Sequence, residues 1–205
     1  MIVPYCFHRV KHAFRFRHRR GYGVHSPFVF DLITSVVRES ADYYAFQPLE
    51  EGIRRGARER KMDQLLFRLS EHLSYRRVLL LGEERVSPAR YLSAVSTRMQ
   101  LWSMPHFPGI SHPVDNPGEF SFESLDMVFL GSECSRYWNT SWEHFLAEST
   151  HQPFCLWIMD IHRDRVNRAI WDSFREKGTV SLDMMWFGLL FFDSRLQAGS
   201  YFLLP

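Results

Sequence analysis

The feature that most constrains the fold of this chain is an alternation of short apolar runs with longer helical patterns. Four runs have the length and continuity of strands buried on both faces: residues 77–81, 99–103, 126–130 and 154–159. Helical patterns lie between them, such as residues 164–178, which close on a glycine. Strands that alternate with helices form a mostly parallel sheet covered on both faces. The sequence therefore predicts an α/β fold.

The first sixty residues have a different pattern. Ser26 and Pro27 are typical of a helix start, and the helix that follows would place Phe28, Leu32 and Val36 on one face. A further amphipathic helix is predicted over residues 61–73. We therefore divide the chain into an N-terminal basic helical arm and helix, residues 1–60, packed on an α/β domain, residues 61–205.

Two predictions concern the ends of elements. Ser87 and Pro88 follow the first strand and are expected to cap the next helix. Residues 179–192 are predicted to form one long strand with a kink at Gly188, and residues 200–205 its antiparallel hairpin partner. The sheet would then end in a C-terminal antiparallel hairpin.

Composition excludes several classes of protein. The chain has 205 residues, enough for one core without disulfides, and its three cysteines form no CxxC pattern, which favours a reducing compartment. No apolar window approaches the length of a membrane span, and Arg9 and Lys11 interrupt the core that a signal peptide needs. We expect a cytoplasmic protein. His106 and His112 lack a third ligand at metal-like spacing, so no metal site is predicted.

Three stretches, in order along the chain, resemble a known family. They read GYGVHSPFVFDLIT from residue 21, MDIHRDRVNRAIWDSF from residue 159 and VSLDMMWFGLLFF from residue 180. They are similar to the HGxHSPFVFDLxT motif, the Asp-Asp-Ile-His strand end and the SIDLFxxGIxFF strand of small bacterial class I S-adenosylmethionine-dependent methyltransferases. The resemblance implies a Rossmann-like methyltransferase fold, with S-adenosylmethionine as the cofactor at the carboxyl ends of the first strands.

The turn after the first strand departs from the family pattern. The resemblance implies an acid and two glycines there, and this chain has Leu80, Gly82 and Val86 at those positions. A β-branched side chain at a turn of close approach would collide with a ligand or displace the turn. Glu83 adds a carboxylate near the place of the cofactor's own carboxylate. Gly82 and Glu83 are therefore cofactor-binding positions of a degraded site.

Two more cofactor positions have changed. Ser103 ends the second strand, where the family fold carries an acid that accepts hydrogen bonds from both ribose hydroxyls. Losing such a charge-assisted pair costs roughly 1.5–3 kcal/mol. Gly131 replaces an aspartate after the strand at 126–130. Residues 104–125 contain four prolines and are predicted to lack a helix, and with it a strand, of the cofactor side.

Asp160 and His162 keep the family pattern at the end of the strand at 154–159. In a working enzyme they would be the catalytic candidates, with Asp160 as a base or metal ligand and His162 as an acid or base. The structural alternative is that Asp160 caps the following helix and His162 is a partly exposed polar residue.

A basic arm precedes these elements and is the main candidate for an anionic partner. Three hypotheses stay open for it. The first is that the arm packs on the domain as a helix with a solvated basic face, the second is that it contacts an anionic membrane or partner, and the third is that it binds nucleic-acid phosphates. A second basic cluster covers residues 54–61. The cationic residues of the arm are Arg9, Lys11, Arg15, Arg17, Arg19 and Arg20.

Together these features predict a methyltransferase-like protein with a lost or weakened S-adenosylmethionine site. We interpret it as a pseudoenzyme that acts as a binding or scaffold protein, through the basic arm or through self-association into a homo-oligomer. One alternative is an active methyltransferase with a remodelled pocket, and another is a nucleic-acid-binding module. The sequence leaves the question of enzymatic activity open.

Overall fold

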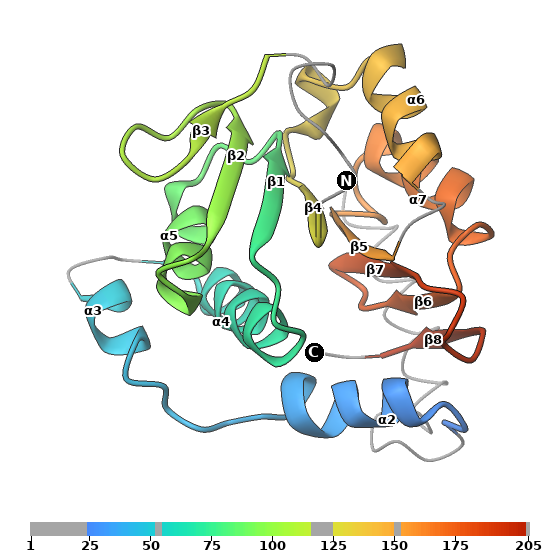
Figure 1. Ribbon diagram of the computed structural model, residues 1–205, viewed down its shortest axis with the longest axis horizontal. Coiled ribbons are helices and arrows are strands. Elements are labelled where there is room, and N and C mark those ends of the chain that lie inside the picture. The colour runs from blue at the N-terminus through green and yellow to red at the C-terminus, as the bar shows by residue number, and fades with distance from the viewer. Residues whose placement is uncertain (1–23, 52–54, 116–124, 150–152, 204–205) are drawn as a thin grey trace.

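The computed structural model describes residues 24–51, 55–115, 125–149 and 153–203 of the chain. These residues form an α/β fold with one eight-stranded sheet (Figure 1). The basic arm predicted at residues 9–20 lies outside the described residues. The strands are β1 (Arg77–Leu81), β2 (Gln100–Met104), β3 (His112–Pro113), β4 (Met127–Leu130), β5 (Phe154–Met159), β6 (Val180–Asp183), β7 (Phe187–Phe192) and β8 (Gly199–Phe202).

The strands are arranged in the order β3-β2-β1-β4-β5-β7-β6-β8. Neighbours from β3 to β5 pair in parallel, β7 pairs antiparallel with both β5 and β6, and β8 is parallel to β6. The prediction of a mostly parallel sheet is confirmed, and the apolar runs at 77–81 and 154–159 match β1 and β5. The carboxyl ends of β1, β4 and β5 therefore meet at one edge of the sheet.

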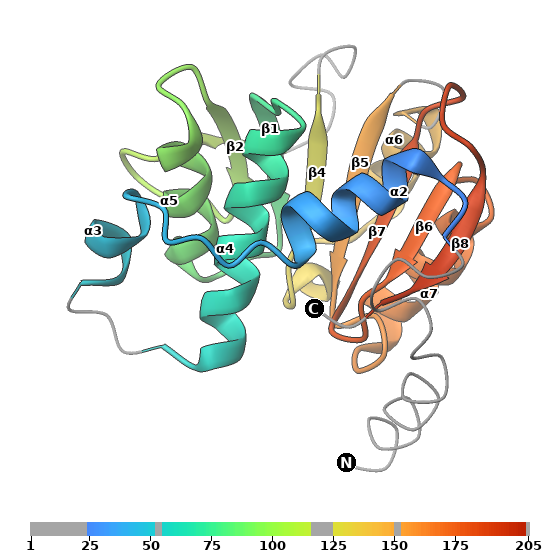
Figure 2. The same cartoon turned by 90° about the horizontal axis from the view of Figure 1, so that it is seen from below.

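Helices cover both faces of the sheet. One core cluster joins α2, η2, α4 and α5 to the sheet, and a second joins α6 and α7 to its other face. In Figure 2, α2 and α4 lie in front of the strands. The helices are α2 (Pro27–Leu32), the π-helical turn η2 (Ile33–Val37), α3 (Phe46–Glu50), α4 (Ala57–His72), α5 (Val86–Val95), the short 3₁₀ turn η4 (Cys134–Arg136), α6 (Thr140–Ser149) and α7 (Arg165–Arg175).

Strand β1 shows why its sequence is apolar from Val78 onward, where the strand is buried. Val78 and Leu80 belong to the first cluster, and Leu79 and Leu81 belong to the second. Because successive side chains of a strand point to opposite faces, a strand covered on both sides has no polar position. The helix start at Ser26 is confirmed, since its side-chain oxygen accepts a hydrogen bond from the Val29 amide at 3.4 Å.

The prediction for the C-terminal strands was wrong in detail. The segment at 179–192 is two strands, β6 and β7, joined by a tight turn in which Met185 has a φ of 67° and the Trp186 amide donates to the Met184 carbonyl. The hairpin lies within this segment, and β8 is a parallel neighbour of β6 rather than a hairpin partner. Gly188 lies inside β7, where a Cβ would be 2.2 Å from the ring of Trp171.

The segment after β2 contains little regular secondary structure, as its prolines predict. Residues 105–115 contain turns and the two-residue strand β3, with no helix. The remainder of the predicted helix-poor stretch, residues 116–124, lies outside the described residues. The side of the crevice next to β2 is therefore built from turns.

Candidate functional site

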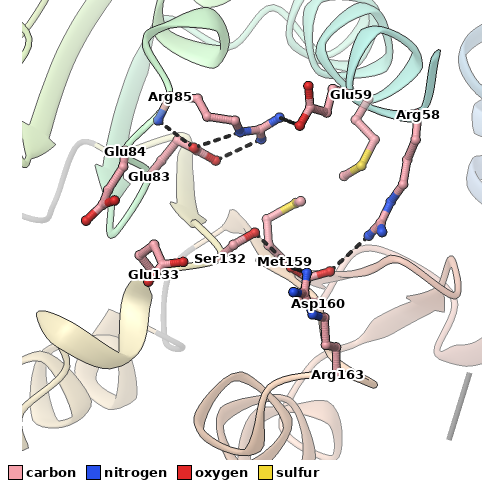
Figure 3. Close-up of a pocket in the computed structure, with 11 residues that line it drawn as sticks. Arg58, Glu59, Glu83, Glu84, Arg85, Ser132, Glu133, Met159, Asp160 and Arg163 are labelled. Atoms are coloured by element: carbon pink, nitrogen blue, oxygen red, sulfur yellow. Dashed lines mark hydrogen bonds and ion pairs between the residues drawn. The ribbon is translucent and has the colours of Figure 1, made fainter. Parts of the chain in front are cut away.

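A cavity of about 250 Å³ lies where the carboxyl ends of β1, β4 and β5 approach the first turns of α4 (Figure 3). This is the place at which ligands bind in open α/β sheets. Charged side chains face one another across it, and two methionines contribute apolar surface. Its lining residues are Arg58, Glu59, Met62, Glu83, Glu84, Arg85, Ser132, Glu133, Met159, Asp160 and Arg163.

The turn after β1 is packed directly against the turn after β4. Gly82 has a φ of 70°, and its carbonyl accepts a hydrogen bond from the Glu133 amide at 3.0 Å. A Cβ at Gly82 would be 2.2 Å from the Cα of Cys134. The glycine is required because protein backbone lies against it, and not because the turn leaves room for a ligand.

Gly131 fits the same junction from the other side. Its amide donates to the Leu81 carbonyl at 2.8 Å, and a Cβ at this position would be 2.4 Å from the Gly82 carbonyl oxygen and 2.5 Å from the Glu83 Cα. The aspartate that the resemblance implies at this position cannot be accommodated unless the β1 turn moves. The two glycines therefore close the gap between the ends of β1 and β4.

Glu83 has been incorporated into the turn as a buried ion pair. Its side chain is 2% exposed. Its Oε1 accepts hydrogen bonds from the Arg85 amide at 2.9 Å and Nε at 3.0 Å, and its Oε2 accepts one from Nη2 at 2.9 Å. Burial lowers the pKa of Arg85, but the hydrogen bond and charge of Glu83 outweigh it, so that this pKa is raised. Glu84 points elsewhere and pairs with Arg136.

This local structure overturns the predicted serine cap of α5. The helix begins at Val86 with Arg85 as its N-cap, and Ser87 is buried in the first turn. The hydrogen bond from the Arg85 amide to Glu83 fixes the extended residue before the helix, so the helix starts two residues earlier than predicted. Val86 is 43% exposed at the start of α5 and does not close the crevice by its own bulk.

Leu80 and Ser103 lie outside the cavity. Leu80 is fully buried in the core, at the position where the resemblance implies an acid. Ser103 is 1% exposed, and its hydroxyl is hydrogen-bonded to that of Ser111 in the turn after β2. Neither side chain is available to a ligand at the strand ends.

Asp160 is the polar centre of the cavity. Its side chain is 6% exposed, and its carboxylate accepts hydrogen bonds from Arg58 Nη2 at 2.9 Å and from the Ser132 hydroxyl at 2.8 Å. Arg163 lies 3.9 Å away on the solvent side. The residue has a φ of 50°, and its amide donates to the Trp186 carbonyl. Both oxygens of this carboxylate are therefore already engaged by protein groups.

The expectation that Asp160 caps α7 was wrong. Asp164 caps this helix, with Oδ1 accepting hydrogen bonds from the amides of Val166 at 2.8 Å and Asn167 at 3.1 Å. The left-handed backbone at Asp160 begins a tight turn, in which its carbonyl accepts from the Arg163 and Asp164 amides. This turn separates Asp160 from the N-cap of α7, and the helix begins where the pattern over residues 164–178 predicts.

His162 is separated from Asp160 and faces β6. The residue as a whole is partly exposed, as expected, but its side chain is only 4% exposed. Nε2 lies 3.0 and 2.9 Å from the two carboxylate oxygens of Asp183, and Nδ1 lies 3.0 Å from Arg168 Nη1. Since arginine only donates, Nδ1 is the acceptor and Nε2 carries the hydrogen. Both ring nitrogens are thus engaged by protein groups, and His162 does not line the cavity.

The sequence did not identify Arg58 or Ser132 as site residues. Arg58 comes from the basic cluster at 54–61, in which the structure pairs Arg55 with Asp63 at 2.8 Å and Arg58 with Asp160. Arg58 also lies over the ring of Trp186, 5.1 Å from its centroid. The useful signal was the excess of arginine around the start of α4, but the partner of Arg58 is 102 residues away.

These residues do not fit S-adenosylmethionine as the resemblance implies it. The acid positions after β1 and β2 are absent, the space between the β1 and β4 turns is filled by backbone, and the cavity of about 250 Å³ is below the usual range for small-molecule sites. Within the described residues, no group of three or more metal-binding side chains occurs, and no helix is long and apolar enough to cross a membrane. No protein-family model matches the chain, and no curated protein matches it.

Proposed function

We propose that this chain is a methyltransferase-like protein whose cofactor crevice has become a structural junction, and that it acts as a binding or scaffold protein. The methyltransferase part is supported by the sequence resemblance and by the strand order, in which an antiparallel hairpin is added to a parallel sheet. The pseudoenzyme part is carried by one observation, the backbone contact between the β1 and β4 turns at Gly82 and Gly131.

Two ion pairs support the same proposal. Glu83 with Arg85 and Arg58 with Asp160 place mutually satisfied charges on opposite sides of the cavity (Figure 3). The two carboxylates are buried, with side-chain exposures of 2% for Glu83 and 6% for Asp160, whereas the two arginines are about one-third exposed. A ligand that took either guanidinium would remove the nearest counter-charge of a buried carboxylate, which is costly. The pairs therefore stabilise the cavity in its present form and oppose binding of a charged cofactor.

The test is calorimetric titration of the purified chain with S-adenosylmethionine and, separately, with S-adenosylhomocysteine. We expect no heat of binding with either ligand up to concentrations on the order of 1 mM. A functional small methyltransferase titrated under the same conditions serves as the positive control. Micromolar binding to this chain would contradict the proposal and would favour the active methyltransferase, for which Asp160→Ala should then abolish methyl transfer without unfolding the chain.

A further inference from the structure

A second cavity, away from the strand ends, contains an arginine without a counter-ion. It has a volume of about 340 Å³, within the usual range for small-molecule sites. It lies between α4 and the stretch that connects η2 to α3, which crosses in front of α4 in Figure 2. Its lining residues are Val37, Glu39, Ser40, Ala41, Asp42, Phe46, Lys61, Gln64, Leu65 and Arg68.

Arg68 is the feature that distinguishes this cavity. The residue is only 9% exposed, and its Nε has no hydrogen-bond partner. In the described part of the chain, the guanidinium forms no ion pair; Tyr43 and Glu39 are the groups near enough to influence its charge. Buried arginines are normally paired, because an unpaired buried charge is costly. A buried guanidinium that lines an open cavity, with its Nε unpaired among the described residues, points to an acceptor that these residues do not supply.

The helix places a second cation on the same face. Lys61, Gln64, Leu65 and Arg68 follow the spacing i, i+3, i+4, i+7, so they line one side of the cavity along two turns of α4. Lys61 is exposed at one end of this row and Arg68 is buried at the other. The Gln64 side chain donates to Glu50 at 2.7 Å, so it belongs to the wall and is already engaged.

The remaining walls define what kind of anion would fit. Val37, Phe46 and Leu65 provide apolar surface beside the two cations. Glu39 and Asp42 lie on the opposite wall, and Oε1 of Glu39 accepts the Ala41 amide at 2.7 Å. Two acids beside the site would repel a dianion such as phosphate, but they can accept a hydrogen bond from an ammonium or amide N–H close to a single carboxylate.

We propose that this cavity binds the α-carboxylate of an apolar amino acid, with the carboxylate on Arg68 and the side chain against Val37, Phe46 and Leu65. A planar guanidinium and a carboxylate form a two-pronged pair, which is the strongest common hydrogen-bonded arrangement of this kind. The α-carboxylate belongs either to the free amino acid or to the last residue of a peptide, and the two sources differ only in whether the α-nitrogen is an ammonium or an amide. This inference does not depend on the fate of the cofactor crevice.

The experiment is a nuclear magnetic resonance titration of the ¹⁵N-labelled full chain with three small molecules. L-leucine represents the free amino acid, N-acetyl-L-leucine represents a peptide end, and L-leucinamide lacks the carboxylate. We expect at least one of the two carboxylates to shift the amides of residues 37–42 and 61–68, with a Kd on the order of 1 mM or tighter. L-leucinamide should leave them unshifted. Binding of N-acetyl-L-leucine alone identifies a peptide end, and binding of L-leucine alone identifies the free amino acid.

The matched variants are Arg68→Met, which removes the guanidinium, and Arg98→Met, which changes an exposed arginine outside the cavity. Arg68→Met should weaken carboxylate binding at least about tenfold, whereas Arg98→Met should leave it unchanged. Equal shifts with L-leucinamide, no shift with either carboxylate, or full binding by Arg68→Met would overturn the proposal. The comparison of the three ligands uses the natural chain alone, so it tests carboxylate binding even if a variant does not fold.

Discussion

At the scale of single residues, Gly131 is the position on which the closed crevice most directly depends. A Cβ there would lie 2.4 Å from the Gly82 carbonyl oxygen, and backbone atoms cannot move aside as a flexible side chain can. We expect Gly131→Ala to lower the free energy of unfolding by about 3 kcal/mol, the upper part of the range for overpacked sites. Urea unfolding followed by circular dichroism measures this change.

Gly178 provides the control for this prediction. An added Cβ at Gly178 would make ordinary contacts with Leu190, the nearest at 3.6 Å. The free energy of unfolding of Gly178→Ala should therefore stay within about 0.5 kcal/mol of that of the natural chain. If Gly131→Ala were equally harmless, the two turns would not be locked together, and the crevice could open for a ligand.

The reactivity of Cys134 is a second prediction at the scale of single residues. Burial raises the pKa of its thiol to about 12, and its side chain is fully buried beside Gly82. Only the thiolate reacts with alkylating reagents, so at about pH 8 this cysteine should stay unmodified by iodoacetamide in the native chain. Peptide mass spectrometry, with the urea-unfolded chain as the positive control, reads the modification at Cys134 itself. Rapid native labelling would mean that the β4 turn opens on the timescale of the reaction.

At the scale of elements, the contact between α7 and the sheet depends on one missing side chain. Gly188 of β7 lies under the ring of Trp171, which is 2% exposed, and a Cβ would be 2.2 Å from the Trp171 ring. Gly188→Ala should therefore destabilise the chain by about 1–3 kcal/mol. The double variant Gly188→Ala with Trp171→Leu should lose less unfolding free energy than the two single variants together, because the smaller side chain at position 171 leaves room for the added methyl group. Strict additivity in thermal unfolding would show that the two residues do not contact.

The pair of Asp31 and His72 connects α2 to the end of α4 and gives the fold a pH dependence. Hydrogen bonds from His72, and then from Ser35, lower the pKa of Asp31 against a small opposing effect of burial. Because the folded pKa lies below the unfolded value of about 3.9, the pair stabilises the fold above that pH and ceases to do so as the pH falls through the folded pKa. In a ¹³C titration of the carboxyl group, His72→Gln should raise this pKa, and Ser35→Ala should raise it less.

The same elements show which parts of the fold could be predicted from sequence. Strands β1 and β5 were predicted correctly, because continuous apolar runs of their length have few other uses. The turn between β6 and β7 was missed because its residues, Met184, Met185 and Trp186, are apolar and carry none of the glycine, proline or asparagine that signals a turn. In the structure, Oδ1 of Asp183 accepts a hydrogen bond from the Met185 amide at 3.0 Å and so supports the positive φ of this methionine.

The candidate site could be predicted only where its contacts are local. The unusual turn at Gly82 and Glu83 was visible in the sequence, and the structure places Glu83 in the lining of the strand-end cavity and Gly82 against the backbone of the β4 turn. The contact of Arg58 with Asp160 joins residues 102 apart, and no local pattern indicates it. Similarly, the arginines around the start of α4 formed a basic cluster in the sequence, but no local pattern showed that Arg55 pairs with Asp63 and Arg58 with Asp160.

At the scale of the whole molecule, the N-terminal helices share the core of the sheet. Leu32 and Ile33, at the junction of α2 and η2, are each 1% exposed and belong to the same cluster as strand residues such as Leu80 and Trp157. A division of the chain near residue 60 therefore separates segments that pack together. We expect the described residues to unfold as one cooperative unit.

Leu32→Ala tests this expectation, because it removes a large buried side chain from α2. The change should lower the free energy of unfolding by about 2–5 kcal/mol. If the molecule is one unit, the urea midpoint should fall equally in tryptophan fluorescence, which senses Trp157 and Trp171 on the two faces of the sheet, and in far-ultraviolet circular dichroism, which senses the helices. The exposed Phe30 of the same helix is the control, since Phe30→Ala removes a side chain with 47% exposure and should shift both midpoints far less. A fluorescence midpoint that stayed in place while the helical signal was lost early would show that α2 and η2 unfold separately from the sheet.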